Sequence, residues 1–248
     1  AVDYTTMDGY RAFSTSDMVN YKDHGVILHS SNLSWGVPGH MFAPTFAKQN
    51  GKYYCFFPHA PDASFDNMNC GVAVSDVPQG PFKDLGILKG VKGRWIDPCV
   101  FTDEDGTSYL YWGVNEPKVA KLKDNMTELA EEPRDIVYDS DNFFEASYMH
   151  KYKGKYYFSY SAKKGGYAAI GDSPYGPFTT NHVINPAQKQ DHHSMLEFNE
   201  QWYFFYHVPD WNGGSGYRRN TCVEKIYYNP SGTIKPVYPS KEGVSKVK

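Results

Sequence analysis

A short unit that joins a polar turn to an aromatic strand recurs along the chain. Its copies lie at residues 49–57, 104–112, 152–160 and 198–206. In each copy a polar turn, often Asn-Gly or Asp-Gly, is followed by a strand-like run rich in Tyr, Phe or Trp. Asn-Gly and Asp-Gly favour tight hairpins because both turn positions need a positive φ. The pattern therefore predicts four β-hairpins.

A second unit, which reads as a strand, a turn and another strand, accompanies the first. Residues 72–82 are echoed by residues 169–178, and a looser copy lies at residues 12–21. The turns of the four hairpins fall at positions 51, 106, 154 and 200, with spacings of 55, 48 and 46 residues. Two hairpins in a period of roughly 40–50 residues are typical of a four-stranded propeller blade. A β-sandwich would not explain so long a repeat with a constant order of parts.

We therefore expect an all-β fold, a five-bladed β-propeller that residues 1–248 form as a single domain. Helical periodicity is nearly absent, and residues 125–132 are a short helix candidate that a loop would also explain. Residues 1–30 carry outer strands with no aromatic hairpin before them. The inner hairpin of the first blade is thus expected to be missing. Either an N-terminal portion is absent, or the ring closes in some other way.

Composition narrows the possible partners. The 21 Tyr, 15 Phe and 5 Trp favour half-buried strands, and their flat faces also suit stacking on sugar rings. The formal net charge is −3 without a Lys/Arg-rich run, which argues against a nucleic-acid partner. No apolar stretch approaches the roughly 20 residues of a membrane span.

The four Cys have no C-x-x-C spacing, so neither a disulfide framework nor a zinc site is expected. No signal peptide is expected in this chain, and the compartment and the oligomeric state stay open.

The residues that stand at the same distance before each hairpin turn are candidates for the active site. Nine residues before the four turn positions stand Phe42, Asp97, Glu145 and Asp191. The innermost strands of a propeller converge on its axis, so these residues should line one end of the same cavity. Two carboxyl groups facing one pocket are what glycoside hydrolysis requires. An isolated carboxylate would more often be a structural cap or a surface ion pair, but the matched register favours catalysis.

The surroundings of Glu145 suit a general acid. Its apolar neighbours could desolvate the carboxyl group and raise its pKa, and Asp97 would raise it further as a nearby like charge. His192 and His193 enter the same axial position, either as structural residues or as ligands. His192 could hold a hard cation there, largely through water.

Two arginines precede the alternating strand-like segment 221–226. Arg218 or Arg219 could hold a substrate hydroxyl with its rigid fork if it enters a cleft. For whichever arginine points outward, a surface ion pair is an equally good explanation.

Several of these segments together resemble glycoside hydrolase family 43. They are residues 95–101, 144–146, 192–194, 14–25 and 216–219, and the resemblance runs along nearly the whole chain. It implies a five-bladed propeller and an inverting, single-displacement mechanism. On this resemblance Glu145 is the general acid, and Asp97 modulates the pKa of Glu145 and orients it.

The same resemblance assigns the remaining candidates. His192 matches a histidine that helps to hold a calcium ion at the axis. Arg219, in better register than Arg218, matches an arginine that contacts sugar hydroxyls. Phe42 would wall the sugar subsite, and Trp35 would add to that wall.

The general base departs from the family pattern. In the family it is an Asp in an Ala-Asp-Pro segment on the inner strand of blade one, and no such segment occurs in this chain. Asp3 and Asp8 lie too late in the pattern to replace it. We therefore expect a family member that lacks roughly 30–40 N-terminal residues here, since a blade unit is about 40–50 residues.

The leading functional hypothesis is an enzyme that releases xylose and/or arabinose from xylo-oligosaccharides or arabinoxylan. One alternative is an endo-arabinanase of the same fold. Another is a non-catalytic carbohydrate-binding propeller, because the general base is not found. A propeller that serves as an interaction scaffold ranks last, since it needs no carboxylates in register.

Overall fold

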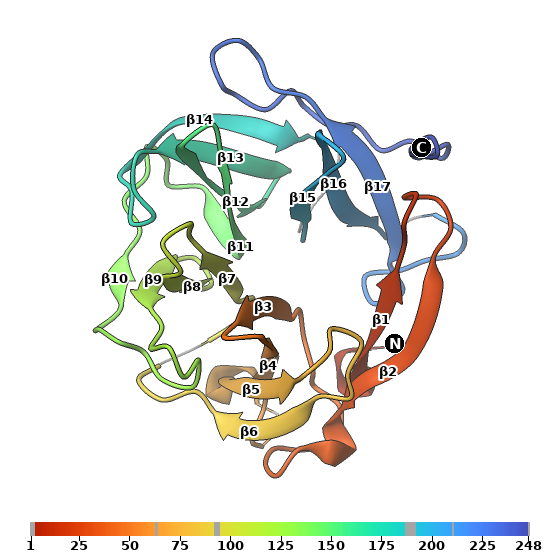
Figure 1. Cartoon of the computed structure of the whole chain (residues 1–248), viewed down its shortest axis with the longest axis vertical. Coiled ribbons are helices and arrows are strands. Elements are labelled where there is room, and N and C mark those ends of the chain that lie inside the picture. The colour runs from red at the N-terminus through yellow and green to blue at the C-terminus, as the bar shows by residue number, and fades with distance from the viewer. Residues whose placement is uncertain (1–2, 63, 92–94, 187–191, 210, 248) are drawn as a thin grey trace. The chain divides into compact units, whose positions relative to one another are not determined.

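The computed structural model describes residues 3–62, 64–91, 95–186, 192–209 and 211–247 (Figure 1). In these ranges the regular elements are β-strands and the short 3-10 helices η1 (Tyr4–Thr6), η2 (Ser30–Asn32) and η3 (Phe65–Asn67). The all-β prediction is confirmed. The helix candidate at residues 125–132 is wrong, because this segment forms turns and isolated β-bridges. Among the described residues, no helix has the length and hydropathy needed to cross a membrane.

The chain divides into two compact units. Residues 1–15 and 21–135 form the first unit, and residues 16–20 and 136–248 form the second. The expectation of one domain over residues 1–248 stays a prediction.

The first unit contains antiparallel sheets of two, four and four strands. The two-stranded sheet pairs β1 (Gly9–Ser14) with β2 (Lys22–His29). The next sheet has the order β3 (Thr45–Gln49), β4 (Lys52–His59), β5 (Asn69–Ser75) and β6 (Lys83–Ile87). The third has the order β7 (Cys99–Thr102), β8 (Ser108–Trp112), β9 (Lys118–Lys121) and β10 (Arg134–Asp135). The two larger sheets each follow the chain order of a propeller blade.

The second unit contains two antiparallel sheets with the same meander. One has the order β11 (Phe143–Tyr152), β12 (Lys155–Ala162), β13 (Gly166–Gly171) and β14 (Phe178–Asn185). The other has the order β15 (Ser194–Phe198), β16 (Gln201–Val208) and β17 (Asn220–Ile226).

The predicted hairpins are confirmed as β3–β4, β7–β8, β11–β12 and β15–β16. In β3–β4 both residues of the two-residue turn have positive φ, 51° at Asn50 and 75° at Gly51. The turns of β11–β12 and β15–β16 have the same property. This geometry matches the right-handed twist of the flanking strands. The two clearer copies of the outer unit are β5–β6 and β13–β14.

The described residues form four blade-like sheets rather than five complete ones. Residues 3–30 contribute the two-stranded sheet β1–β2 and no inner hairpin, so five full blades are not confirmed. Within each unit, however, the first strands of successive sheets are neighbours. The Val100 amide of β7 donates to Thr45 Oγ1 of β3 at 3.3 Å, and the Tyr148 hydroxyl of β11 donates to the Met195 carbonyl of β15 at 2.5 Å. This is the local arrangement that a propeller needs.

A buried histidine lies in the core of the second unit. His150 on β11 is 4% exposed, its ring stacks on Tyr157, and its Nε2 lies 3.0 Å from the hydroxyl of Tyr228. Burial lowers the pKa of His150 to about 3, and the nearby His193 adds to this shift. The imidazole is therefore held neutral in the folded protein.

We predict that His150 weakens the fold in mild acid. The pKa of an unfolded histidine is near 6.5. As the pH falls below about 6.5, the unfolded chain therefore binds a proton at this histidine, whereas folded His150 stays neutral. Down to the folded pKa of about 3, this favours unfolding by up to about 1.4 kcal/mol per pH unit. Urea unfolding at pH 7 and pH 5 should show a drop that is roughly 2 kcal/mol smaller in His150→Phe. Equal drops in both proteins would contradict this prediction.

Candidate active site

In the first unit, Phe42 and Asp97 lie where the innermost strands begin. Phe42 precedes β3 and is partly exposed, and Asp97 precedes β7 with 4% of its surface exposed. The hydroxyl of Tyr10 donates to the Phe42 carbonyl at 2.6 Å. Burial raises the pKa of Tyr10, and Cys55, Cys70 and the Asp97 carboxylate add to this rise. Phe42 and Asp97 therefore share the surroundings of one tyrosine.

The backbone at Asp97 has an unusual conformation. Asp97 has a φ of 53° and is followed by Pro98. Left-handed backbone is uncommon outside glycine, although Asp tolerates it better than most residues. Conformations of this kind cost on the order of 1–3 kcal/mol and persist where the surroundings impose them, often at functional sites.

Trp35 packs into the core of the first unit. Its ring is stacked with Phe57 at a centroid distance of 6.3 Å and meets His59 edge-on at 4.9 Å. These packing partners cover much of the Trp35 surface. Contact between Trp35 and a sugar stays a prediction.

Glu145 is the third residue of β11 and lies at an interruption of the strand pairing. It pairs with Ser161, and the register shifts on both sides of it. Its side chain is 13% exposed. The next residue, Ala146, has a φ of 60° and is 6% exposed. A β-bulge re-aims side chains locally and is common beside active sites.

Aromatic packing fixes the start of β11. The ring of Phe143 stacks on Phe158 at a centroid distance of 6.1 Å, and its amide donates to the hydroxyl of Tyr138 at 3.3 Å. The ring of Tyr160 lies 5.5 Å from both Phe143 and Tyr138. The residue two positions before Glu145 is thus held on several sides.

Glu145 and His192 are brought together in the second unit. His192 Nε2 lies 3.3 Å from Glu145 Oε1, and the two side chains are 21% and 13% exposed. His193 points to another set of contacts, with its Nε2 2.8 Å from Ser159 Oγ and its ring stacked on Phe204. His192 is therefore the histidine that faces the carboxyl group. Asp191 lies outside the described residues.

The structure adds His207, which the sequence pattern did not single out. Its ring lies 5.9 Å from that of His192. β15 and β16 pair Ser194 with Phe205, so extending this antiparallel register by two residues sets His192 opposite His207. A search for polar residues at the end of the second strand of each hairpin would have found it.

The two arginines lie in the loop between β16 and β17. Both Arg218 and Arg219 are exposed, and Arg219 Nε donates to the Gly216 carbonyl at 2.6 Å. Substrate contact by either arginine stays a prediction.

Neither early aspartate stands at the head of an inner strand. Asp3 caps η1 by accepting from the amides of Thr5 and Thr6, and Asp8 is paired with His29 at 3.4 Å. The hydrogen bond from the Thr5 hydroxyl is the main cause that lowers the pKa of Asp3. Asp3 and Asp8 thus both have local partners. That this chain lacks the general base stays a prediction.

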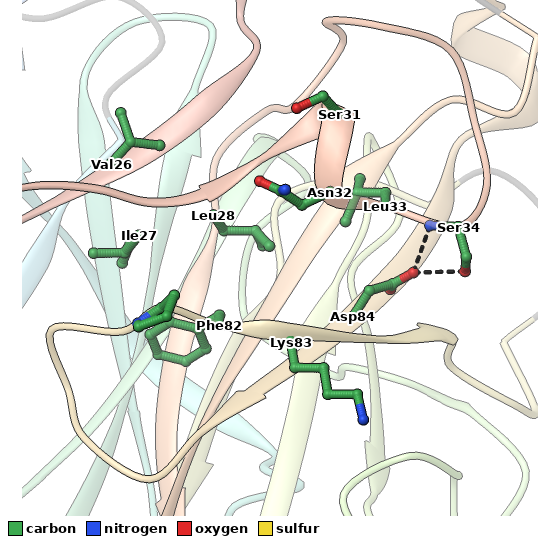
Figure 2. Close-up of a pocket in the computed structure, with 11 residues that line it drawn as sticks. Val26, Ile27, Leu28, Ser31, Asn32, Leu33, Ser34, Phe82, Lys83 and Asp84 are labelled. Atoms are coloured by element: carbon green, nitrogen blue, oxygen red, sulfur yellow. Dashed lines mark hydrogen bonds between the residues drawn. The ribbon is translucent and has the colours of Figure 1, made fainter.

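A groove of about 540 Å³ in the first unit contains none of the predicted site residues (Figure 2). It lies between β2, η2 with the segment that follows it, and the start of β6. Its carboxylate, Asp84, accepts from the amide and hydroxyl of Ser34 at 2.8 and 2.6 Å, and from the Gly86 amide. Although burial opposes the shift, these bonds hold the pKa of Asp84 below its usual range. Asp84 thus anchors a loop, and we do not assign the active site to this groove.

Comparison with known proteins agrees with the resemblance read from the sequence. Residues 2–234 match Glycosyl hydrolases family 43. The chain is 36% identical to Xylosidase/arabinosidase 43A of Humicola insolens, over 94% of this chain and 86% of that protein. It is also 36% identical to a Xylosidase/arabinosidase of Bacteroides ovatus, over 94% of this chain and 84% of that protein.

Solved structures give the same result. The GH43_1 enzyme of Xanthomonas citri complexed with xylotriose has a TM-score of 0.88 at 31% identity, covering 98% of this chain and 86% of that one. CoXyl43 is a GH43 β-xylosidase/α-arabinofuranosidase from a compost microbial metagenome, solved with xylotriose in a calcium-free form. It has a TM-score of 0.85 at 33% identity, covering 95% of this chain and 85% of that one. Since the family match spans nearly the whole chain and these relatives are matched along most of their own length, the chain belongs to glycosyl hydrolases family 43.

Proposed function

We propose that this family 43 glycosidase releases xylose, arabinose or both from xylo-oligosaccharides or arabinoxylan. The observation that carries the proposal is Glu145, a carboxyl group largely shielded from solvent and set on a bulge at the head of an inner strand. The xylosidase/arabinosidase relatives support the choice of pentose, and both solved neighbours described above are complexes with xylotriose. The ring that carries the site is proposed to have five blades, with β1 and β2 belonging to the first.

In the proposed reaction, the protonated carboxyl group of Glu145 donates its proton to the leaving glycosidic oxygen. A water molecule attacks the anomeric carbon from the opposite face, so the bond to the leaving oxygen breaks as the bond to water forms, and the configuration inverts. A second carboxylate, about 6.5–9.5 Å from the first, takes the proton of that water. Asp97 is proposed to orient Glu145 and to influence its protonation through its charge. Phe42, Trp35, Arg219 and Arg218 are proposed to contact the sugar.

A calcium ion is a further proposal for the axis of the ring. Calcium prefers six to eight oxygen ligands, whereas His192 offers ring nitrogen and already faces Glu145 at 3.3 Å. His192 and Glu145 therefore fit an ion that is coordinated mostly by water better than an ion whose ligands all come from the protein. When bound, such an ion would supply positive charge near the reacting sugar.

The test is hydrolysis by the full-length protein. Release from 4-nitrophenyl β-xyloside, 4-nitrophenyl α-arabinofuranoside, xylobiose and arabinoxylan should be measured, with anomeric configuration followed by NMR. Repeating the assay with EDTA and after calcium is restored tests the metal proposal. Cleavage of linear arabinan alone would support the endo-arabinanase, and binding without turnover would support the carbohydrate-binding alternative.

A further inference from the structure

We infer that Ala146 is a positioning residue whose left-handed backbone aims the carboxyl group of Glu145. The inference rests on the proposed role of Glu145 as general acid. It is carried by the backbone of β11 and by the pairing of β11 with β12, both of which lie within the second unit.

The conformation of Ala146 is unusual for its place in the fold. In the same unit, Thr180 within β14 has a φ of 57° at a register shift of the β13–β14 pair. Lys153 and Asn199 also have positive φ, but they lie in hairpin turns, whose geometry requires it. Ala146 instead lies inside the ten-residue strand β11, with a φ of 60°. Alanine has no polar side chain that could compensate locally, so the surrounding structure must impose this conformation.

The pairing shows what this conformation achieves. From Tyr148 onward the register is regular, with Tyr148 opposite Ser159 and each later residue one step along. Before that point, Glu145 is opposite Ser161, so Ala146 and Ser147 together face the single residue Tyr160. This is the two-against-one count of a β-bulge.

A second extra residue precedes Glu145. Phe143 is opposite Ala162 and Glu145 is opposite Ser161, which leaves Phe144 without a counterpart in the register. Each one-residue shift reverses the face that the following side chains take. Because Glu145 lies between two such shifts, the direction of its side chain does not follow the alternation of side chains in the parts of β11 before and after it.

The direction that results brings Glu145 to His192. Its carboxyl oxygen lies 3.3 Å from the imidazole, while the side chain of Ala146 is turned into the protein with 6% exposure. If Ala146 returned to ordinary strand geometry, the bulge would be lost and the carboxyl group would take a different direction. Positioning of this kind decides proton transfer, since a displacement of about 1 Å can cost on the order of 10²-fold in rate.

The experiment compares substitutions that differ in their tolerance of positive φ. Gly and Asn adopt this conformation readily, whereas in β-branched Thr it costs more free energy. The variants are Ala146→Gly, Ala146→Asn and Ala146→Thr. Asn and Thr are nearly equal in volume and both add polar atoms. Ala169→Thr on β13 is the control for crowding, because Ala169 is fully buried in the same sheet and its φ is not positive.

The readout is kcat and KM on two β-xylosides with different leaving groups. Xylobiose has a poor leaving group that needs a proton donor, and 2,4-dinitrophenyl β-xyloside has a good one that does not. Ala146→Gly and Ala146→Asn should stay within about threefold of wild type on both. Ala146→Thr should lose about 10²-fold in kcat on xylobiose but only a few-fold on the dinitrophenyl substrate, at similar KM. Ala169→Thr should lose activity equally on both, if at all.

Three outcomes would overturn the inference while leaving the proposed function intact. They are equal losses for Ala146→Thr and Ala146→Asn, a loss for Ala146→Thr that is the same on both substrates, and a large loss for Ala146→Gly. If wild type cleaves neither β-xyloside nor 4-nitrophenyl α-arabinofuranoside, both the proposed function and the inference are wrong.

Discussion

Glu145→Gln is expected to lower kcat on xylobiose by about 10²–10⁴-fold, the range that a positioned proton donor usually contributes. Glutamine keeps the shape of the side chain but carries no transferable proton. Activity on 2,4-dinitrophenyl β-xyloside should fall far less, because that leaving group departs without protonation. The measurement is steady-state kinetics on both substrates, with the melting temperature compared to show that the fold is retained.

Glu197→Gln is the matched control for this prediction. Glu197 lies on β15 in the same unit, and its side chain is exposed. The same chemical change there should leave both rates within about twofold, because exposed substitutions away from special features have small effects. If Glu145→Gln retains full activity on xylobiose, Glu145 is not the acid, and the register argument that selected it fails.

Phe158→Ala is expected to cost about 3–5 kcal/mol of stability, the usual range for removing a fully buried aromatic ring. Phe158 lies on β12 with no exposed surface. Its ring contacts Phe143, Tyr138 and Phe178 at centroid distances of 6.1, 6.0 and 5.5 Å. The loss should appear in urea denaturation as a lower midpoint.

Phe13→Ala provides the comparison for the stability prediction. Phe13 on β1 is 57% exposed, so the same substitution removes little buried area and should cost less than about 1 kcal/mol. Similar losses for Phe13→Ala and Phe158→Ala would mean that burial in the core of the second unit does not set the energy. A normal unfolding midpoint for Phe158→Ala would contradict the prediction directly.

The fold was readable from the sequence because its information is local and repeated. A tight turn with positive φ needs particular residues, and the strands beside it need aromatic or β-branched ones. Each hairpin therefore has the same sequence pattern, and four copies of this pattern at similar spacing indicate the blades. The turn at Gly106 shows the limit of this reading. Thr102 and Ser108 close a longer loop there, although the sequence pattern matches the two-residue turns.

The candidate site was only partly readable. Counting nine residues back from a turn finds Glu145 and Asp97, because regular strands convert sequence distance into position. The count could not find His207, which comes from the other strand of its hairpin. It also could not reveal the left-handed backbone at Ala146 or Asp97, since neither residue is one that usually marks such a conformation as glycine does.

By itself, the sequence of this protein determined the all-β class, the order of the hairpins and the identity of the acid candidate. These follow from turn chemistry and from a repeat that needs no long-range information. Only the tertiary structure decided that His192 rather than His193 faces Glu145, and that two register shifts set the direction of Glu145. The physical reason is that a bulge depends on how two strands pair, and this pairing is a compromise among many packed side chains rather than a property of any short segment.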